Sequence, residues 1–405
     1  MAKYIFIFYG VILAALAVSW LLFDPAGNQF ASSDNGIPGD KLFAVNMKPE
    51  AGPTTGTGPQ GPQLSPEPVI VAAGDCLPQK PIGGLDKAVN SQLRRIDAYQ
   101  KLCGSRAFEQ VMFFTSMPKT SEEAETMATD MVAALGESYK FGVSPIVIVE
   151  PVRGNSDYLA FADIARGVYD AELYTYFAKL KAKGIDDAKM GLWVPFPEPN
   201  INEWGLNNNN PDDFAAAVNH YATICKKFFP GGKLSVLLDN LSYDVKTGNY
   251  AHLPLDPYLR GLDNRNLENI GLQGFPGAET GADNQAGTFL DHDLAVASAN
   301  FLDLKSVWLN TGTFSTARGE NGRIINMSAP ERSKILDGIT QEAIAAKSAG
   351  LKVSINLFAQ DKSVADEGID WSYLKTDQDR KILVDFISRA NRFGIGLSLY
   401  DDPED

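Results

Sequence analysis

Cysteine and histidine are scarce in this chain of 405 residues, which contains three of each. The cysteines form no Cys-x-x-Cys pair, and His220, His252 and His292 are not spaced like the ligands of a zinc site. We therefore expect neither a structural metal ion nor a cofactor.

Positively charged residues are also outnumbered by negatively charged ones. The chain has 36 Lys and Arg against 50 Asp and Glu, which gives a formal net charge of −14. An acidic surface of this kind repels nucleic acid and anionic lipid, so we expect no nucleic-acid partner. The electrostatic field of this surface neither attracts nor repels a neutral ligand such as an uncharged sugar.

Charge is absent from the segment Tyr4–Phe23, which is predominantly apolar. As a helix it would rise roughly 30 Å, about the thickness of the hydrocarbon core of a bilayer. Lys3 precedes it and Asp24 follows it, which predicts a cytoplasmic N-terminus. We expect a single-pass protein of the cell membrane, held through residues 4–23 with its main domain outside. The alternative is a cleaved signal peptide, residues 1–23, and a secreted protein.

Residues 24–75 have few apolar side chains that could form a core and are rich in proline and glycine. This composition is typical of an extended, mobile tether. The predicted organisation is therefore an anchor or signal peptide (1–23), a linker (24–75) and one large domain (76–405).

From about residue 80, short apolar runs alternate with segments of helical periodicity. The predicted strands are Pro81–Leu85, Gln110–Thr115, Pro145–Val149, Met190–Phe196, Leu234–Leu238, Ile270–Phe275, Ser306–Asn310 and Lys352–Phe358. Eight such units in this length predict an α/β fold, a closed (β/α)8 TIM barrel. A doubly wound sheet is the alternative, but no glycine-rich phosphate turn follows the first run. A further run, Ile395–Tyr400, could be an added strand that seals the bottom of the barrel or the edge of the domain.

Two cysteines flank the first predicted unit. Cys76 precedes its strand, and Cys103 ends its helix just before the second strand. Both should lie at the amino-terminal face of the barrel, so we expect a Cys76–Cys103 disulfide, with Cys225 free.

Chemistry in a barrel of this kind is expected at the carboxyl ends of the strands. The fourth predicted strand is followed by Glu198, Asn200 and Trp204. A carboxyl group can protonate a glycosidic oxygen, an amide can bond hydroxyl groups, and an indole ring can stack on a sugar face. These three residues therefore predict a carbohydrate site, although solvated loop carboxylates and core tryptophans are also common at such positions.

Several motifs occur in an order that is similar to glycoside hydrolase family 26, the β-mannanase type. The matching segments are Val149-Glu150-Pro151, Arg166-Gly167-Val168-Tyr169-Asp170, Pro197-Glu198-Pro199-Asn200 with Trp204-Gly205, Gly271-Leu272-Gln273-Gly274-Phe275, Lys305-Ser306-Val307-Trp308-Leu309 and Asp370-Trp371. The resemblance covers about residues 80–393. It implies a sugar-binding barrel in which Glu198 matches the family's acid/base and Glu150, Asn200, Trp204, Phe275 and Trp371 belong to the substrate site.

The chain departs from the family at three supporting positions. The family's nucleophile is a Glu at the end of the seventh strand, and Thr311 stands there. Phe275 replaces a Tyr whose hydroxyl supports that nucleophile, and Pro197 replaces a His. The retaining mechanism needs two carboxyl groups about 5–5.5 Å apart, so these changes remove it.

An inverting mechanism would need a second carboxylate about 6.5–9.5 Å from Glu198. Asp239, at the end of the fifth strand, and Glu320, after the seventh, are the candidates. Three hypotheses remain open at this stage. The first is a weakly active or inactive barrel that binds a β-linked, mannan-type glycan outside the cell. The second is an active endo-β-glycosidase, and the third is a structural or protein-interaction barrel.

Overall fold

The structure is a computed structural model of the chain, and it describes most of the region from residue 72 to residue 400. The described residues are 72–75, 85–103, 108–153, 157–200, 210–239, 255–274, 304–318, 324–359, 361–362, 369–370, 373 and 375–400. Within them, no helix is both long and apolar enough to cross a membrane. The segment Tyr4–Phe23 and the start of the linker lie outside this part of the chain.

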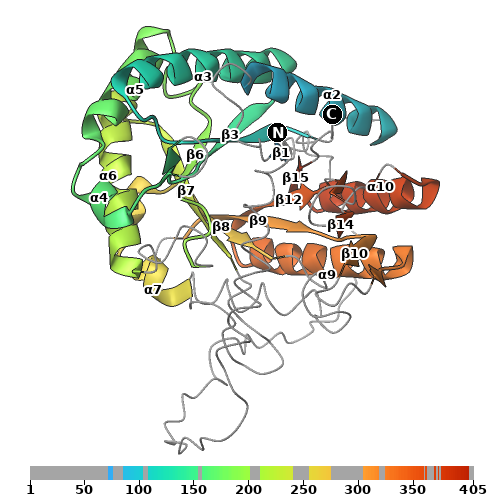
Figure 1. Cartoon of the computed structure of the whole chain (residues 1–405). Coiled ribbons are helices and arrows are strands. Elements are labelled where there is room, and N and C mark those ends of the chain that lie inside the picture. Colours follow the sequence, from blue (N-terminus) through green and yellow to red (C-terminus); the bar gives the residue numbers. More distant parts are fainter. Residues whose placement is uncertain are drawn as a thin grey trace, which may run out of the picture.

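Among the described residues, the main sheet contains nine parallel strands in the order β1-β2-β3-β6-β7-β8-β9-β12-β15. These strands are β1 (Ala72–Asp75), β2 (Gln110–Thr115), β3 (Ser144–Val149), β6 (Leu192–Pro195), β7 (Lys233–Asp239), β8 (Asn269–Gln273), β9 (Ser306–Gly312), β12 (Lys352–Phe358) and β15 (Gly396–Tyr400). The sheet curls until β15 lies against β1 (Figure 1). The prediction of a parallel α/β barrel is therefore confirmed.

Helices surround the curled sheet on its outside (Figure 1). They are α2 (Leu85–Cys103), α3 (Ser121–Phe141), α4 (Phe161–Ala165), α5 (Asp170–Ala182), α6 (Pro211–Phe228), α7 (Leu255–Arg260), the 3-10 turn η2 (Asn264–Asn266), α9 (Ala329–Ser348) and α10 (Asp377–Arg392). Local sequence explains where they begin. Thr120 accepts a hydrogen bond from the Glu123 N–H at the start of α3, and Ser328 and Glu331 form a full capping box at the start of α9.

The first strand was predicted at the wrong place. The structure puts β1 at Ala72–Asp75, inside the segment assigned to the linker, and α2 already begins at Leu85. The short run Val69–Ala73 is apolar, and its first three residues are β-branched, but the prolines and glycines around it dominated the composition of the segment. The additional run near residue 395 was predicted correctly as a strand: β15 extends the main sheet beyond β12.

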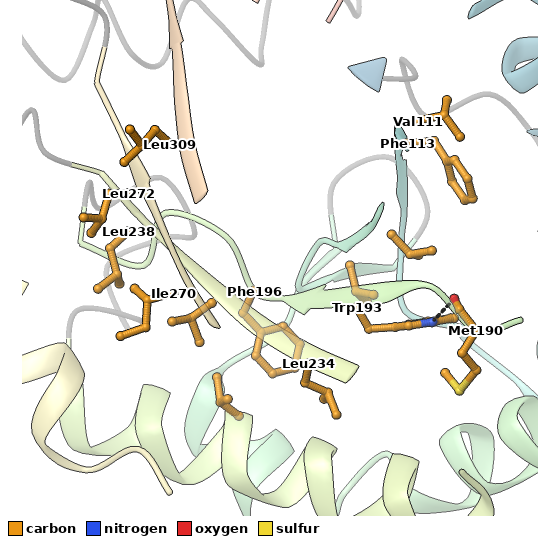
Figure 2. Packing of buried hydrophobic residues seen from close by; sticks show 14 of the residues in the cluster. Val111, Phe113, Met190, Trp193, Phe196, Leu234, Leu238, Ile270, Leu272 and Leu309 are labelled. Carbon is orange, nitrogen blue, oxygen red and sulfur yellow. Dashed lines mark hydrogen bonds between the residues drawn. The ribbon is translucent and has the colours of Figure 1, made fainter. Parts of the chain in front are cut away.

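The two faces of the sheet have separate cores. The outer face packs against the helices, and Figure 2 shows Trp193, Phe196, Leu238, Leu272 and Leu309 in this layer. The Trp193 indole N–H donates to the Met190 carbonyl oxygen at 2.9 Å. The inner face holds a smaller apolar cluster that includes Met112, Ile146, Ile148, Leu192, Val194, Leu237 and Trp308.

Gly271 on β8 makes room for the Trp308 ring of β9 inside the barrel. A Cβ at residue 271 would lie 2.4 Å from Trp308 Cε2, closer than two carbon atoms can pack. We expect Gly271→Ala to lower the free energy of unfolding by about 1–3 kcal/mol, as overpacking does in other cores.

Gly136→Ala is the matched control, because Gly136 lies within α3 and a Cβ there would meet nothing within 4 Å. This variant should gain about 0.5–1 kcal/mol from helix propensity. Urea unfolding of both variants tests the prediction. A Gly271→Ala protein as stable as Gly136→Ala would show that the ring can move aside.

Cys103 is a free thiol in the structure, and Cys76, the other half of the expected disulfide, lies outside the described residues. Cys225 is also free, as predicted, and is buried in α6. Burial raises the pKa of the Cys103 thiol to about 11 and that of the Cys225 thiol to about 12. Neither is a thiolate at neutral pH, so neither can act as a nucleophile there.

Candidate functional site at the carboxyl ends of the strands

Glu198 follows β6 in a distorted stretch of backbone. Phe196 and Glu198 have φ values of 54° and 53°, and they are the only non-glycine residues of positive φ in the described part of the chain. The Phe196 N–H donates to the Val149 carbonyl at 2.8 Å, and the Glu198 N–H donates to the Leu237 carbonyl at 2.7 Å. These bonds tie the strained turn to β3 and β7. Strain of this kind is concentrated at functional sites, where the surrounding structure maintains it.

A row of side-chain amides connects Glu198 to the far side of the barrel. The Gln273 amide N–H donates to Glu198 Oε1, the Asn310 amide N–H to Gln273 Oε1, and the Asn356 amide N–H to Asn310 Oδ1. We call Gln273, Asn310 and Asn356 the amide ladder. Every member of the ladder is buried, whereas Glu198 is partly exposed.

Strand register explains the ladder. Asp239, Gln273, Asn310 and Asn356 are successive register partners across β7, β8, β9 and β12. Side chains two residues apart on a strand share a face, so this row lies on the same face as Leu237 and Trp308 of the inner cluster. The carboxyl end of the barrel interior is therefore polar in these four strands, and the layer below it is apolar.

Asn200 has a different role from the one predicted. Its amide N–H donates to the Asp239 carbonyl at 2.6 Å, and its amide oxygen accepts from the Asp239 N–H at 3.0 Å. The side chain has no exposed surface. The expectation that Asn200 bonds sugar hydroxyls is therefore wrong for this geometry: the residue fixes the end of β7 beside the Glu198 turn.

Thr311 matches the family's nucleophile in sequence but does not face the barrel interior. It shares a strand face with Val307 and Leu309, which belong to the outer core. Its side chain has no exposed surface, and its hydroxyl has no hydrogen-bond partner in the described part of the chain. The inward residue at this point of β9 is its neighbour, Asn310, which is an amide and not a carboxylate.

Two of the other predicted carboxylates, Asp239 and Glu150, are less accessible than Glu198. Asp239 has no exposed surface and Glu150 is 7% exposed. Asp239 shares the inner row, so the structure brings it near the Gln273 that binds Glu198. The remaining predicted site residues, Trp204, Phe275, Glu320 and Trp371, lie outside the described residues. Within the described part, no three His, Cys, Asp or Glu side chains are grouped as metal ligands.

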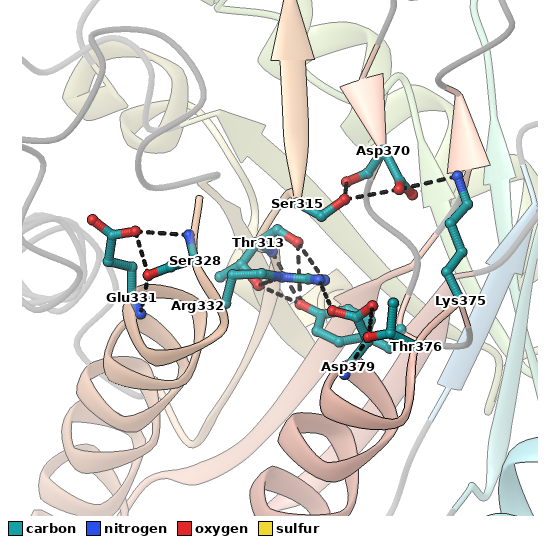
Figure 3. Close-up of polar contacts among 10 residues, drawn as sticks. Thr313, Ser315, Ser328, Glu331, Arg332, Asp370, Lys375, Thr376 and Asp379 are labelled. Atoms are coloured by element: carbon teal, nitrogen blue, oxygen red, sulfur yellow. Dashed lines mark hydrogen bonds and ion pairs between the residues drawn. The ribbon is translucent and has the colours of Figure 1, made fainter. Parts of the chain in front are cut away.

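A buried polar network supports the loop that follows β9 (Figure 3). Arg332, at the start of α9, donates to Asp379 Oδ1 at 2.7 Å and to the Thr313 carbonyl at 3.1 Å. Its guanidinium lies 4.3 Å from the centre of the Tyr373 ring, whose hydroxyl is 2.6 Å from Thr313 Oγ1. The network joins the starts of α9 and α10 to the residue that follows β9.

A small antiparallel sheet connects the loops after β9 and β12. It has the order β11-β10-β14-β13, with β10 (Thr316–Arg318), β11 (Ile324–Asn326), β13 (Asp361–Lys362) and β14 (Ile369–Asp370). Asp370 accepts from the Ser315 hydroxyl at 2.8 Å and pairs with Lys375 at 3.0 Å. The segments that follow β9 and β12 are therefore tied together by strand pairing and by the contacts of Asp370.

Comparison with known proteins agrees with this architecture. No family model and no curated protein matches the sequence. Solved structures do match. A β-glucosidase from Thermotoga maritima in complex with deoxynojirimycin has a TM-score of 0.53 at 10% identity, over 82% of this chain and 99% of that one. The same enzyme with methoxycarbonyl-substituted glucoimidazole has a TM-score of 0.55 at 11% identity, over 80% and 98%.

An exo-β-1,4-mannosidase from Opitutaceae bacterium strain TAV5 has a TM-score of 0.52 at 15% identity, over 80% of this chain and 60% of that one. At such low identity these matches establish the fold alone. The chain has a parallel α/β barrel that is similar in fold to these enzymes, and the matches do not single out family 26.

Proposed function

We propose that this barrel binds a neutral β-linked glycan of the mannan type at the carboxyl ends of β6 to β12, with weak hydrolysis or none. The proposal rests mainly on Glu198. This residue is a partly exposed carboxylate in a strained turn, bonded by Gln273 at the end of the barrel where this fold has its sites. The predicted N-terminal anchor would hold the domain outside the cell.

The surroundings of Glu198 argue against efficient hydrolysis. Glycoside hydrolysis uses two carboxyl groups on either side of the scissile bond. At the carboxyl end of the inner face, β8, β9 and β12 each present an amide beside Glu198, and amides neither attack a sugar carbon nor take a proton from water. Without a second catalytic carboxylate, Glu198 can contribute only general acid assistance, typically about 10²–10⁴-fold.

An active glycosidase with Asp239 as the second carboxylate is the alternative. One observation favours it: Asp239 and Gln273 are register partners, and Gln273 binds Glu198. The burial of Asp239 opposes it, because the second group must reach a water molecule or the sugar itself.

Calorimetric titration of the full-length chain with mannohexaose and cellohexaose tests the proposal. We expect binding of at least one of them, and no reducing ends released above the blank. Glu198→Ala should weaken binding about tenfold, the effect of losing a hydrogen bond to a charged group. Glu198→Gln should retain most of the affinity, and Trp204→Ala should weaken it by removing the stacking platform.

Glu137→Ala, which removes a partly exposed carboxylate near the end of α3, should leave binding unchanged. If neither sugar binds, the proposal fails. Rapid hydrolysis that is lost in Glu198→Gln would instead establish the glycosidase.

A further inference from the structure

The direction of the hydrogen bonds in the amide ladder is set by one end. A carboxylate can only accept hydrogen bonds, so Gln273 must turn its N–H₂ toward Glu198. The oxygen of Gln273 then faces Asn310, which must donate in turn, and Asn310 presents its own oxygen to Asn356.

The other end of the ladder does not fix this order. The Asn356 side chain is 1% exposed, and its amide oxygen has no hydrogen-bond partner in the described part of the chain. If nothing constrained it, the Asn356 amide would rotate so that its oxygen accepts a hydrogen bond, since an unsatisfied buried acceptor costs free energy. The orientation of Asn356 is therefore imposed from Glu198, through Gln273 and Asn310.

We propose that Gln273, Asn310 and Asn356 form a directional hydrogen-bond relay, set by Glu198, that holds this carboxylate in place as an acceptor and thereby selects ligands that donate hydroxyl groups. The three amides are positioning residues, because they act on the ligand through Glu198. The choice of ligand rests on the proposed function, whereas the relay itself does not. A carboxylate held in this way accepts from the hydroxyls of a neutral glycan and repels the carboxylate of a uronic acid.

A double-mutant cycle between positions 356 and 198 tests the relay without any sugar. In Asn356→Asp the new carboxylate can only accept, so Asn310 and Gln273 must both turn round. The oxygen of Gln273 then faces the carboxylate of Glu198. We expect the midpoint of thermal unfolding of the full-length chain to fall by about 5 °C, as for a buried network with two opposed acceptors.

The second substitution should reverse this loss. Glu198→Gln supplies an N–H₂ group that can donate to the oxygen of the reoriented Gln273. The double variant should therefore recover more than half of the lost midpoint temperature. Additive effects of the two substitutions would contradict the relay.

Two controls separate the relay from simple charge repulsion. Gln273→Met has nearly the same shape but breaks the middle of the ladder, so the coupling between positions 356 and 198 should disappear in that background. Ser354→Asp puts the same charge on the same face of β12, two residues from Asn356 and outside the ladder, and Glu198→Gln should not rescue it. Coupling that persists in Gln273→Met would overturn the relay.

A folded single variant gives a second test if Asn356→Asp does not fold. The side-chain amide NMR resonances of Asn310 and Asn356 should shift in Glu198→Gln, although neither residue bonds to position 198. Unchanged Asn356 resonances would overturn the relay.

The ligand selection is tested by titrating the wild-type chain with mannohexaose and with an oligosaccharide of β-linked mannuronic acid. We expect the neutral sugar to bind at least tenfold more tightly. Equal or tighter binding of the uronate would refute the selection while leaving the coupling result intact. Failure of both sugars to bind would refute the proposed function, and the thermal cycle would still decide the relay.

Discussion

Arg332→Met should lower the free energy of unfolding by about 3–5 kcal/mol, the usual cost of removing one partner of a buried ion pair. The Arg332 side chain is 1% exposed, and it binds Asp379 and two atoms of Thr313 (Figure 3). Methionine fills much of the same volume but leaves the Asp379 carboxylate without its cation. Urea unfolding of the purified chain measures the loss.

Arg380→Met is the control for this prediction. Arg380 pairs with Asp377 at the same 2.7 Å, but the two side chains are 42% and 97% exposed. Exposed ion pairs contribute little, so this variant should change stability by less than about 1 kcal/mol. Equal losses in the two variants would mean that burial of the Arg332 network does not matter to stability.

Thr311→Glu should destabilise the protein by about 3 kcal/mol or more and should not create a glycosidase. The resemblance of the sequence to family 26 suggests instead that a carboxylate at this position would restore the nucleophile. The structure turns residue 311 toward the outer core with Leu309, where a new carboxylate would be buried without a cation. Unfolding by urea and release of reducing ends from mannohexaose would be measured on the same preparation.

Thr311→Val has nearly the same shape as threonine and provides the control. The Thr311 hydroxyl has no hydrogen-bond partner in the described residues, so its removal should raise stability by about 1 kcal/mol. A stable Thr311→Glu protein that gains hydrolysis would contradict the orientation of this strand and revive the retaining mechanism.

Much of the barrel could be predicted because its strands are buried on both sides. Runs such as Pro145–Val149 and Leu234–Leu238 are largely apolar and lie between amphipathic segments. β1 was missed because it is only four residues long and its composition resembles the linker before it. Hydrophobicity was therefore enough to predict that most strands exist. The position of the first strand depends on its pairing with β2, which is a long-range contact.

The candidate site was only partly predictable. Glu198 could be found because a carboxylate between two prolines directly follows a buried strand. The distinction between Asn310 and Thr311 depends on which of two adjacent residues faces inward, and a one-residue change of phase reverses that assignment. Val307, Trp308 and Leu309 are all apolar, so hydrophobicity alone does not indicate the phase. The burial of Asn200 against Asp239 depends on how the turn after β6 folds onto β7, which no local pattern indicates.

Native mass spectrometry of the full-length chain after a day with mannohexaose tests the central claim most directly, because the mass of the bound sugar reports both binding and cleavage. Our account predicts an adduct of the intact hexasaccharide on the wild-type protein and on Glu198→Gln, with no shorter sugar in either sample. Absence of any adduct, or shorter sugars that appear with the wild-type chain and disappear in Glu198→Gln, would contradict it.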